Sequence, residues 1–266
     1  MSKNQYVDSF LKGIKNKEKN NLNSPNNEES ILSAINLAYG DAKRTMTGIG
    51  DFDVSIKNTA FKNLANKFLE YFKNAAPDSE ESALGEKYFD DFHEKLCKIW
   101  CDAFSNSSTI GTYGKAQKIV NMTFKYLYCC ENVDENYFKY CHMPLDSFTL
   151  EWYKRITEKD DKSNKVNLPY DMKWSKLDKD LYIKITNKIR EKLKQNLKLN
   201  DKNGNGISLP EEPLLAEFII WPNIQLQMAV EDFYFAYNDI RNANEKRTFK
   251  EMTLDVKLKE IKKVLP

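Results

Sequence analysis

Apolar residues recur every three or four positions along most of this chain, the spacing that buries one face of an α-helix. The clearest stripe, in residues 58–74, runs through Phe61, Leu64, Ala65, Phe68, Leu69 and Phe72. The same periodicity predicts helices over about 29–46, 84–104, 115–130 and 178–197. No useful length of chain alternates between apolar and polar residues, as a half-buried strand would. The pattern therefore predicts an all-α (mainly α) protein.

Weaker signals complete the expected organisation of the chain. A short helix fits Tyr6–Leu11, another is expected to begin at Asp134 or Asn136, and the segment after Pro213 is mostly helical. Polar residues dominate 13–30, so we expect residues 1–30 to form an N-terminal helix and a flexible polar arm. Residues 31–266 then form a single compact helical domain with two lobes, which contains a helix-hairpin-helix element at about 86–130.

Composition and charge narrow the classes of protein. The 266 residues are 41% hydrophobic and 12% aromatic, which is typical of a globular chain. The 41 Lys and Arg against 39 Asp and Glu leave a formal charge of +2, which excludes a histone-like polycation. An anionic partner must therefore be met by a local basic patch, because the overall field is weak.

The cysteines and the N-terminal sequence indicate the cellular compartment of the protein. Five cysteines, two of them adjacent, do not make a disulfide framework. The N-terminus does not read as a signal peptide, and no run approaches the roughly 18 apolar residues of a membrane span. We therefore expect a reduced, cytoplasmic protein with no membrane partner, and the sequence indicates no protein partner. With only two histidines, a His-built metal site is not expected.

The first candidate for chemistry is a glycine-bearing loop that leads into a helix. Gly111 and Gly114 lie in or beside this loop, and Lys115 and Lys118 fall at the start of the helix. The positive end of the helix dipole disfavours an ammonium there, and a neutral lysine is a nucleophile. The backbone N–H groups of the two glycines are suited to bind a phosphate oxygen. The plainer interpretation is that these lysines lie on a solvated helix face.

A second short motif, HMPLDSF, contains a carboxylate at a point where the backbone is constrained. Pro144 restricts the chain just before Asp146, which we expect near a helix N-terminus. An aspartate at that place is also an ordinary N-cap. The spacing alone therefore leaves a catalytic role and a structural role open.

Together, IGTYGKAQK and HMPLDSFTLEW resemble the helix-hairpin-helix DNA glycosylase superfamily, whose members place a glycine hairpin and a lysine ahead of an apolar-Pro-apolar-Asp motif. The archaeal 8-oxoguanine glycosylase branch is the most similar, with two lysines seven residues apart on one helix. Here Lys118 and Lys125 have that spacing, and Asp146 follows Lys118 by 28 residues. The resemblance covers about residues 86–156. The hairpin departs from the family form, since it has no proline and contains Tyr113 at a small apolar position.

The resemblance implies a DNA glycosylase that acts on duplex DNA with a damaged or modified base. Such an enzyme requires no cofactor. It also has lyase activity if elimination follows base excision. The base is flipped out of the duplex into a pocket between the lobes. Lys118 would attack the sugar C1′ to form a Schiff base, with Lys115 as the fallback nucleophile. Asp146 would activate the nucleophile and stabilise positive charge on the sugar. Gly111 and Gly114 would bind the DNA backbone. Aromatic rings available to stack on the base are Trp152, Trp174 and Trp221.

The rival signal is a calcium-loop pattern at 201–212. Its oxygen ligands would be Asp201, Asn203, Asn205 and Glu212, with Gly206 at the sharp turn. The segment departs from the calcium-loop pattern at position 8, which is Ser208, and at position 10, which is Pro210. The sequence also contains no second loop with which this one could pair. The alternative function is therefore a non-enzymatic helical binding or interaction protein, stabilised by calcium at this loop.

Geometry separates the two functions. A glycosylase requires Lys118 and Asp146 to face one cleft within several ångströms, whereas a binding protein predicts separate solvated positions and no pocket that fits a base. The sequence does not name the base.

Overall fold

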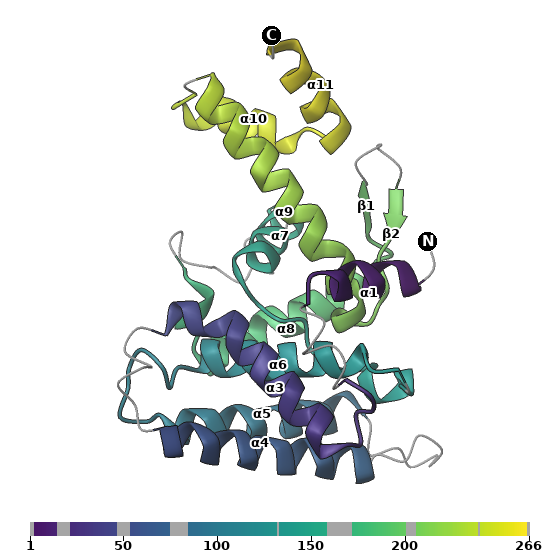
Figure 1. Ribbon diagram of the computed structural model, residues 1–266. Helices are drawn as coiled ribbons and strands as arrows, with labels where there is room; N and C mark the ends of the chain where they lie inside the picture. Colours follow the sequence, from purple (N-terminus) through teal and green to yellow (C-terminus); the bar gives the residue numbers. More distant parts are fainter. Residues whose placement is uncertain are drawn as a thin grey trace.

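The computed structural model describes residues 3–14, 22–46, 54–74, 85–131, 133–158, 172–200, 206–238 and 240–264. Its α-helices are α1 (Lys3–Lys12), α3 (Glu28–Ala42), α4 (Val54–Asn74), α5 (Glu86–Ala103), α6 (Tyr113–Tyr128), α7 (Ser147–Thr157), α8 (Lys179–Leu193), α9 (Pro213–Tyr237), α10 (Ala243–Glu251) and α11 (Leu254–Val264). Three short 3₁₀ helices are η1 (Lys43–Thr45), η3 (Glu135–Phe138) and η4 (Trp174–Lys176). The prediction of a mainly α protein is confirmed (Figure 1).

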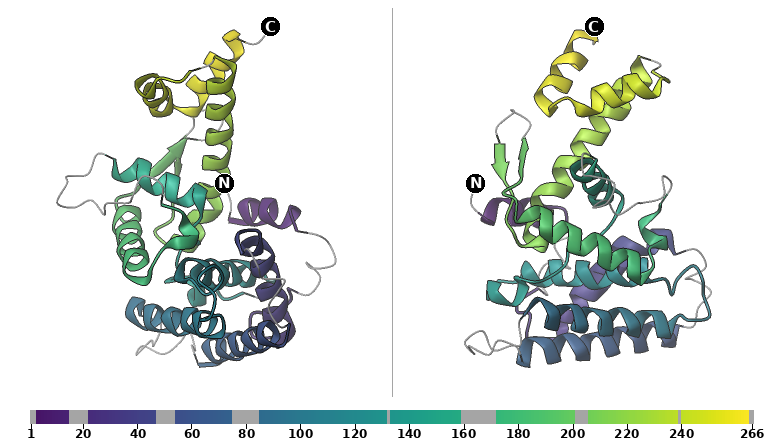
Figure 2. Two further views of the ribbon diagram at one scale, coloured as in Figure 1. Left: turned by 90° about the vertical axis from the view of Figure 1, so that its left-hand side faces the viewer. Right: turned by 180° about the vertical axis from the view of Figure 1, so that it is seen from behind.

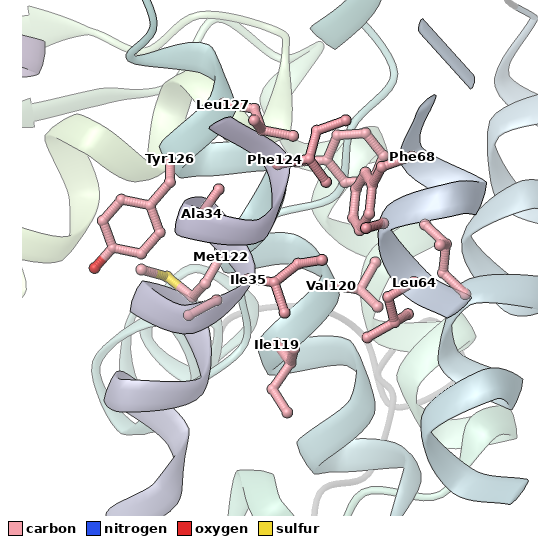
Figure 3. Close-up of a cluster of buried hydrophobic side chains, with 14 of the residues drawn as sticks. Ala34, Ile35, Leu64, Phe68, Ile119, Val120, Met122, Phe124, Tyr126 and Leu127 are labelled. Atoms are coloured by element: carbon pink, nitrogen blue, oxygen red, sulfur yellow. The ribbon is translucent and has the colours of Figure 1, made fainter. Parts of the chain in front are cut away.

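Helix α6 is the centre of the molecule, and all its residues from Gly114 to Tyr128 are buried. Helix α3 crosses α6 on one face and α5 packs along it, while α4 packs against α3 and α5 (Figure 1). Figure 3 shows Val120 and Phe124 of α6 among the side chains that α3 and α4 contribute to this core. A helix buried on every side must place its polar groups against protein partners, because water cannot reach them.

A second cluster of buried side chains lies between α7, α8 and α9, with Trp152, Tyr182 and Ile220 among its members. Helix α9 continues beyond this cluster to carry α10 and α11 at one end of the molecule (Figure 2). A small third cluster, of Val230, Leu254 and Ile261, packs α11 against the end of α9. The division of the chain into domains stays a prediction.

The N-terminal segment is better packed than its polar composition indicates. Helix α1 confirms the short helix predicted around Tyr6–Leu11 and lies against α9. The Phe10 ring stands 5.4 Å from the ring of Phe218. After the part of the arm that lies outside the described residues, Leu22 is buried. At least the described ends of the predicted arm are therefore held by the core.

Two local expectations are wrong. The helix expected from Asp134 or Asn136 is only the 3₁₀ turn η3, because the following chain extends and hydrogen-bonds to side chains of α6 instead of to itself. The sequence also did not indicate the small antiparallel hairpin of β1 (Lys198–Asn200) and β2 (Gly206–Ser208). Strands of three residues are too short to show a clear alternation.

Among the described helices, none combines the length and the apolar character that crossing a bilayer requires.

Candidate functional site

The structure brings Lys118 and Asp146 into direct contact. The Lys118 Nζ donates to Asp146 Oδ2 at 2.8 Å, and the two side chains are only 7% and 11% exposed. Lys118 lies in the second turn of α6, whereas Asp146 stands at the start of α7. The distance that the glycosylase hypothesis requires between these two residues is therefore met, and the pair is buried rather than solvated.

Asp146 is held in place by its own helix. Its Oδ1 accepts hydrogen bonds from the backbone N–H of Phe148 at 3.0 Å and of Thr149 at 3.1 Å. In return, the Asp146 N–H donates to the Thr149 hydroxyl at 2.7 Å, which completes a capping box. The plain N-cap interpretation is thus correct, and it leaves the second oxygen, Oδ2, to face Lys118.

A tryptophan of α9 completes the surroundings of this carboxylate. The Trp221 indole N–H donates to Asp146 Oδ2 at 2.9 Å, and its ring meets Phe148 edge-on with centroids 5.1 Å apart. Burial by itself would raise the pKa of Asp146. The charge and hydrogen bond of Lys118, together with the donors of Thr149 and Trp221, outweigh burial and lower that pKa below its usual value. Asp146 is therefore an anion throughout the neutral range.

A second buried ion pair joins α6 to α9. Lys125, two turns after Lys118 on α6, contacts Glu217, one turn before Trp221 on α9. The Lys125 ammonium also lies over the rings of Phe10 and Phe218, 4.1 and 4.7 Å from their centroids. Among the described residues, neither carboxylate oxygen of Glu217 has a hydrogen-bond donor besides the Lys125 ammonium. Burial raises the pKa of Glu217, and the nearby lysines only partly oppose this.

Sequence reasoning noted Lys125 by its spacing but missed Glu217. One signal was present, since Glu217 is the single charged residue in the apolar run PLLAEFIIW and lies four residues before Trp221. Residues four apart share a helix face. A charge on an apolar helix face needs a buried partner, which Lys125 provides.

The two glycines of the hairpin serve packing. A Cβ on Gly111 would lie 2.3 Å from the Phe104 carbonyl oxygen, and one on Gly114 would lie 2.1 Å from that of Trp174. The Gly111 N–H donates to Ser107 O at 3.0 Å and the Gly114 N–H to Leu177 O at 2.9 Å. Both amides are therefore already bonded inside the protein. Binding of a DNA phosphate by these two amides stays a prediction, and it would require these internal hydrogen bonds to be exchanged.

The fallback nucleophile, Lys115, points away from the pair. Its ammonium donates to the Thr109 carbonyl of the preceding loop, and the residue is buried. The pKa of Lys115 is lowered, as a nucleophile would require, but the cause is burial. Asp146 contacts Lys118 and not Lys115, so the contact that an Asp-assisted reaction needs is made by Lys118.

The three tryptophans fall in different places. Trp221 contacts the Lys118–Asp146 pair, as described. Trp152 is 1% exposed within the second core, and among the described residues its indole N–H has no hydrogen-bond partner. Trp174 belongs to η4, whose backbone packs on Gly114. Of the three predicted pocket residues, the structure places Trp221 beside the candidate pair and Trp152 in the core, and a role of either ring in stacking on a base stays a prediction.

Two hollows are found elsewhere in the described structure. One, of about 110 Å³, is lined by His93, Tyr113, His142 and Tyr182 among others. A larger and more open one, of about 410 Å³, is bordered by Asp90 and Arg190. Neither is lined by Lys118 or Asp146. Neither of these two hollows therefore supplies the cleft expected at the pair, whose side chains are almost fully buried.

The calcium-loop pattern falls mostly outside the described residues, which exclude Asp201, Asn203 and Asn205. Its flanks are described, and they form the β1–β2 hairpin, with Asn200 paired to Gly206. A helix does not lead directly into the loop, because α8 ends at Leu193. Glu212 stands at the N-terminus of α9 without a side-chain capping bond. Calcium binding at 201–212 stays a prediction, and the hairpin flanks differ from the helices the pattern is known for.

Among the described residues, no three His, Cys, Asp or Glu side chains converge as a metal site requires. Comparisons of the chain with models of protein families, with curated proteins and with solved structures find no match.

Proposed function

We propose that this protein is a DNA glycosylase that excises a damaged or modified base and uses Lys118 as its nucleophile. The observation that carries the proposal is the buried contact between Lys118 Nζ and Asp146 Oδ2. The resemblance of IGTYGKAQK and HMPLDSFTLEW to helix-hairpin-helix glycosylases supports it, because the motifs that carry the resemblance are those that supply the two side chains.

The chemistry follows from the partners of each group. Lys118 passes a proton to Asp146 so that the nitrogen lone pair attacks C1′ of the flipped nucleotide. A C1′–N bond forms with Lys118, the glycosidic bond breaks with its electrons leaving on the base, and the base takes up a proton. Opening of the sugar ring, with O4′ protonated to a hydroxyl, leaves a Schiff base on Lys118. While it is ionised, Asp146 stabilises the positive charge that develops on the sugar.

The second buried pair supplies groups that suit a base beside this nucleophile. Among the described residues, the Glu217 carboxylate has no donor besides Lys125, so it can still accept a hydrogen bond from an N–H group at the edge of a base. Trp221 offers an aromatic face next to Asp146. Such a buried, unmatched acceptor is unfavourable in the free protein and is satisfied when a donor enters. Entry requires the covering side chains, which include Phe10 over Lys125, to move aside.

The alternative function, a non-enzymatic helical binding protein, has one observation in its favour. Both members of the Lys118–Asp146 pair are buried, as in an ion pair that only joins α6 to α7. In that case the aspartate is an N-cap and the lysine its counter-charge. The two functions predict different results in the experiment that follows.

The test is borohydride trapping on a panel of duplexes that carry damaged or modified bases, with base release measured in the same samples. The variants are Lys118→Gln and, as a matched control, Lys188→Gln, which removes a mostly buried lysine paired at 3.0 Å with Glu191 on α8. We expect a covalent adduct that disappears in Lys118→Gln and persists in Lys188→Gln. Folded protein that gives neither adduct nor released base on any duplex would overturn the proposal and favour the binding protein.

A further inference from the structure

A side chain on α6 ties the chain just before Asp146 to the chain just before Lys118. The Gln117 Nε2 donates to the Leu145 carbonyl at 2.9 Å, and the Leu145 N–H donates to Gln117 Oε1 at 3.1 Å. Gln117 is fully buried. Because Gln117 and Leu145 each immediately precede one member of the ion pair, this two-bond clamp fixes how α6 and the segment before α7 line up.

The next turn of α6 adds a second tie to the same segment. The Asn121 Nδ2 lies 3.3 Å from the Met143 carbonyl and 3.1 Å from Gln117 Oε1, and one of its two hydrogens is shared between these acceptors. Gln117 Nε2 also donates to the Gly114 carbonyl at 2.8 Å. Gln117 thus uses both its donors and accepts twice, so its amide has one orientation in which every bond is made.

That orientation is set by a chain of hydrogen bonds that begins at a carboxylate. Asp90, held by two bonds from Arg190, can only accept, so His142 Nε2 donates to it at 2.7 Å. Burial lowers the pKa of His142 to about 4, so its ring is neutral and Nδ1 accepts from the Tyr182 hydroxyl at 2.8 Å.

The Tyr182 oxygen in turn accepts from Asn121 Nδ2 at 2.9 Å. The donor and acceptor of each hydrogen bond are therefore set by the preceding bond, from Asp90 through Tyr182 and Asn121 to the amide of Gln117.

We propose that Gln117 and Asn121 are positioning residues, which hold the 143–145 segment so that the carboxylate of Asp146 meets Lys118. The inference rests on the proposed function for its catalytic meaning. The clamp satisfies backbone groups of an extended segment that has no strand partner. Without it, α7 and its cap can form, but the register of Asp146 against Lys118 is no longer fixed. Small misplacements of reacting groups, on the order of 1 Å, can cost about 100-fold in rate.

The test compares Gln117→Met, which keeps the length of the side chain and loses the clamp, with Thr123→Val as a matched control. Thr123 is buried on the same helix, and its hydroxyl donates only within α6, to the Ile119 carbonyl at 2.8 Å. The first readout is the pKa of Asp146, followed by carboxyl carbon NMR in the full chain and assigned by difference from Asp146→Asn. We expect this pKa to rise in Gln117→Met and to stay unchanged in Thr123→Val, because a loosened contact weakens the effect of Lys118 on the carboxylate.

The second readout is base release at single turnover as a function of pH. We expect Gln117→Met to slow release by about 10- to 100-fold and to move the acid limb of the profile to higher pH, a shift that mere loss of stability does not produce. Gln117→Glu keeps an acceptor for the Leu145 N–H, so we expect it to slow base release less than Gln117→Met does. It replaces Gln117→Met in the test if Gln117→Met does not fold.

An Asp146 pKa that stays unchanged in folded Gln117→Met would overturn the positioning role. If that pKa rises while the wild-type protein releases no base, the positioning role stands and only the glycosylase proposal fails.

Discussion

Two lysine–carboxylate pairs link α6 to its neighbours in this protein, and they differ in what surrounds the carboxylate. Asp146 receives hydrogen bonds from two backbone amides and an indole besides Lys118, and its pKa is lowered in spite of burial. Glu217, equally buried, contacts Lys125 but has no further hydrogen-bond donor among the described residues, and burial raises its pKa. The net pKa shifts of the two acids therefore have opposite directions, although a lysine lowers the pKa of each.

In both pairs the lysine lowers the pKa of the acid, and the balance differs because Asp146 has additional donors. At Asp146, the hydrogen bonds from Thr149 and Trp221 add to the effect of Lys118, and together they outweigh burial. At Glu217, the lysines do not outweigh burial, and the charge of Asp146 raises the pKa further. Asp146 is therefore an anion at neutral pH beside Lys118, which suits stabilisation of positive charge, whereas Glu217 suits an acid that accepts a hydrogen bond from a ligand.

The largest effect is expected from removing one member of a buried pair. Lys125→Met leaves the Glu217 carboxylate buried without a counter-charge, and we expect a loss of about 3–5 kcal/mol in the free energy of unfolding. The double variant Lys125→Met with Glu217→Leu should recover most of it, because apolar residues replace a poorly bonded pair well. Lys118→Met with Asp146→Leu should stay destabilised, since the cap of α7 and the partner of Trp221 are also lost. Urea unfolding measures all three, and equal recovery in both doubles would contradict the comparison.

Removing a single donor from Asp146 tests whether the indole matters. Trp221→Phe keeps the aromatic contact with Phe148 and deletes the hydrogen bond to Oδ2. A hydrogen bond to a charged group contributes about 1.5–3 kcal/mol, so we expect a loss of that size in urea unfolding. The pKa of Asp146 should rise. The control Trp174→Phe removes an indole that makes no bond to Asp146 and should leave that pKa unchanged.

The two pairs also depend differently on the start of α6. In Gly114→Ala the new Cβ meets the Trp174 carbonyl, so the first turn of α6 must shift, and we expect a loss of about 1–3 kcal/mol. The control Gly40→Ala, with nothing within 4 Å of its Cβ on helix α3, should gain about 0.5–1 kcal/mol. Lys118 lies nearer this turn than Lys125, so the pKa of Asp146 should change more than that of Glu217. An equal change at both acids would show that the pairs are not separately supported.

The smallest expected effect is a pair of opposite pH dependences in stability. Asp146 has a lower pKa in the folded protein than in the unfolded chain, where its pKa is about 3.9. Its ionised form therefore stabilises the fold above a pH of about 3.9, and this stability is lost as the pH falls through the pKa of the folded protein. Glu217 has a higher pKa in the folded protein than in the unfolded chain, where its pKa is about 4.3. Its neutral form therefore stabilises the fold below a pH of about 4.3, and this stability is lost as the pH rises through the pKa of the folded protein.

Urea unfolding between about pH 3 and pH 7 checks these signs. The stability difference between wild type and Asp146→Asn should shrink toward acid pH, and that between wild type and Glu217→Gln should shrink toward neutral pH. Slopes of the same sign for both variants would contradict the comparison.

The sequence predicted the helical fold because long apolar stripes are a local signal, as α4 and α5 show. The contact of Lys118 with Asp146 was required by only one of the two functional hypotheses, and the structure shows that contact. The helix expected after Asp134 failed because Gln117 and Asn121, distant in sequence, take up the backbone groups of the following segment.

The role of the hairpin glycines could not be predicted for a related reason. A glycine that faces a phosphate and one that faces a neighbouring carbonyl look alike in sequence. Here the acceptor of the Gly114 N–H is Leu177, 63 residues away. Glu217 was missed because a single acid in an apolar run shows that it needs a partner but does not say which one.

The most direct test of the central claim is to locate the covalent bond. Protein trapped with borohydride on a duplex that supports base release is digested, and the peptide that carries the sugar is identified by mass spectrometry. We expect the modified residue to be Lys118, whose nitrogen alone among the three buried lysines of α6 contacts Asp146. A modification on Lys115 or Lys125, or base release that continues undiminished in Lys118→Gln, would contradict the account.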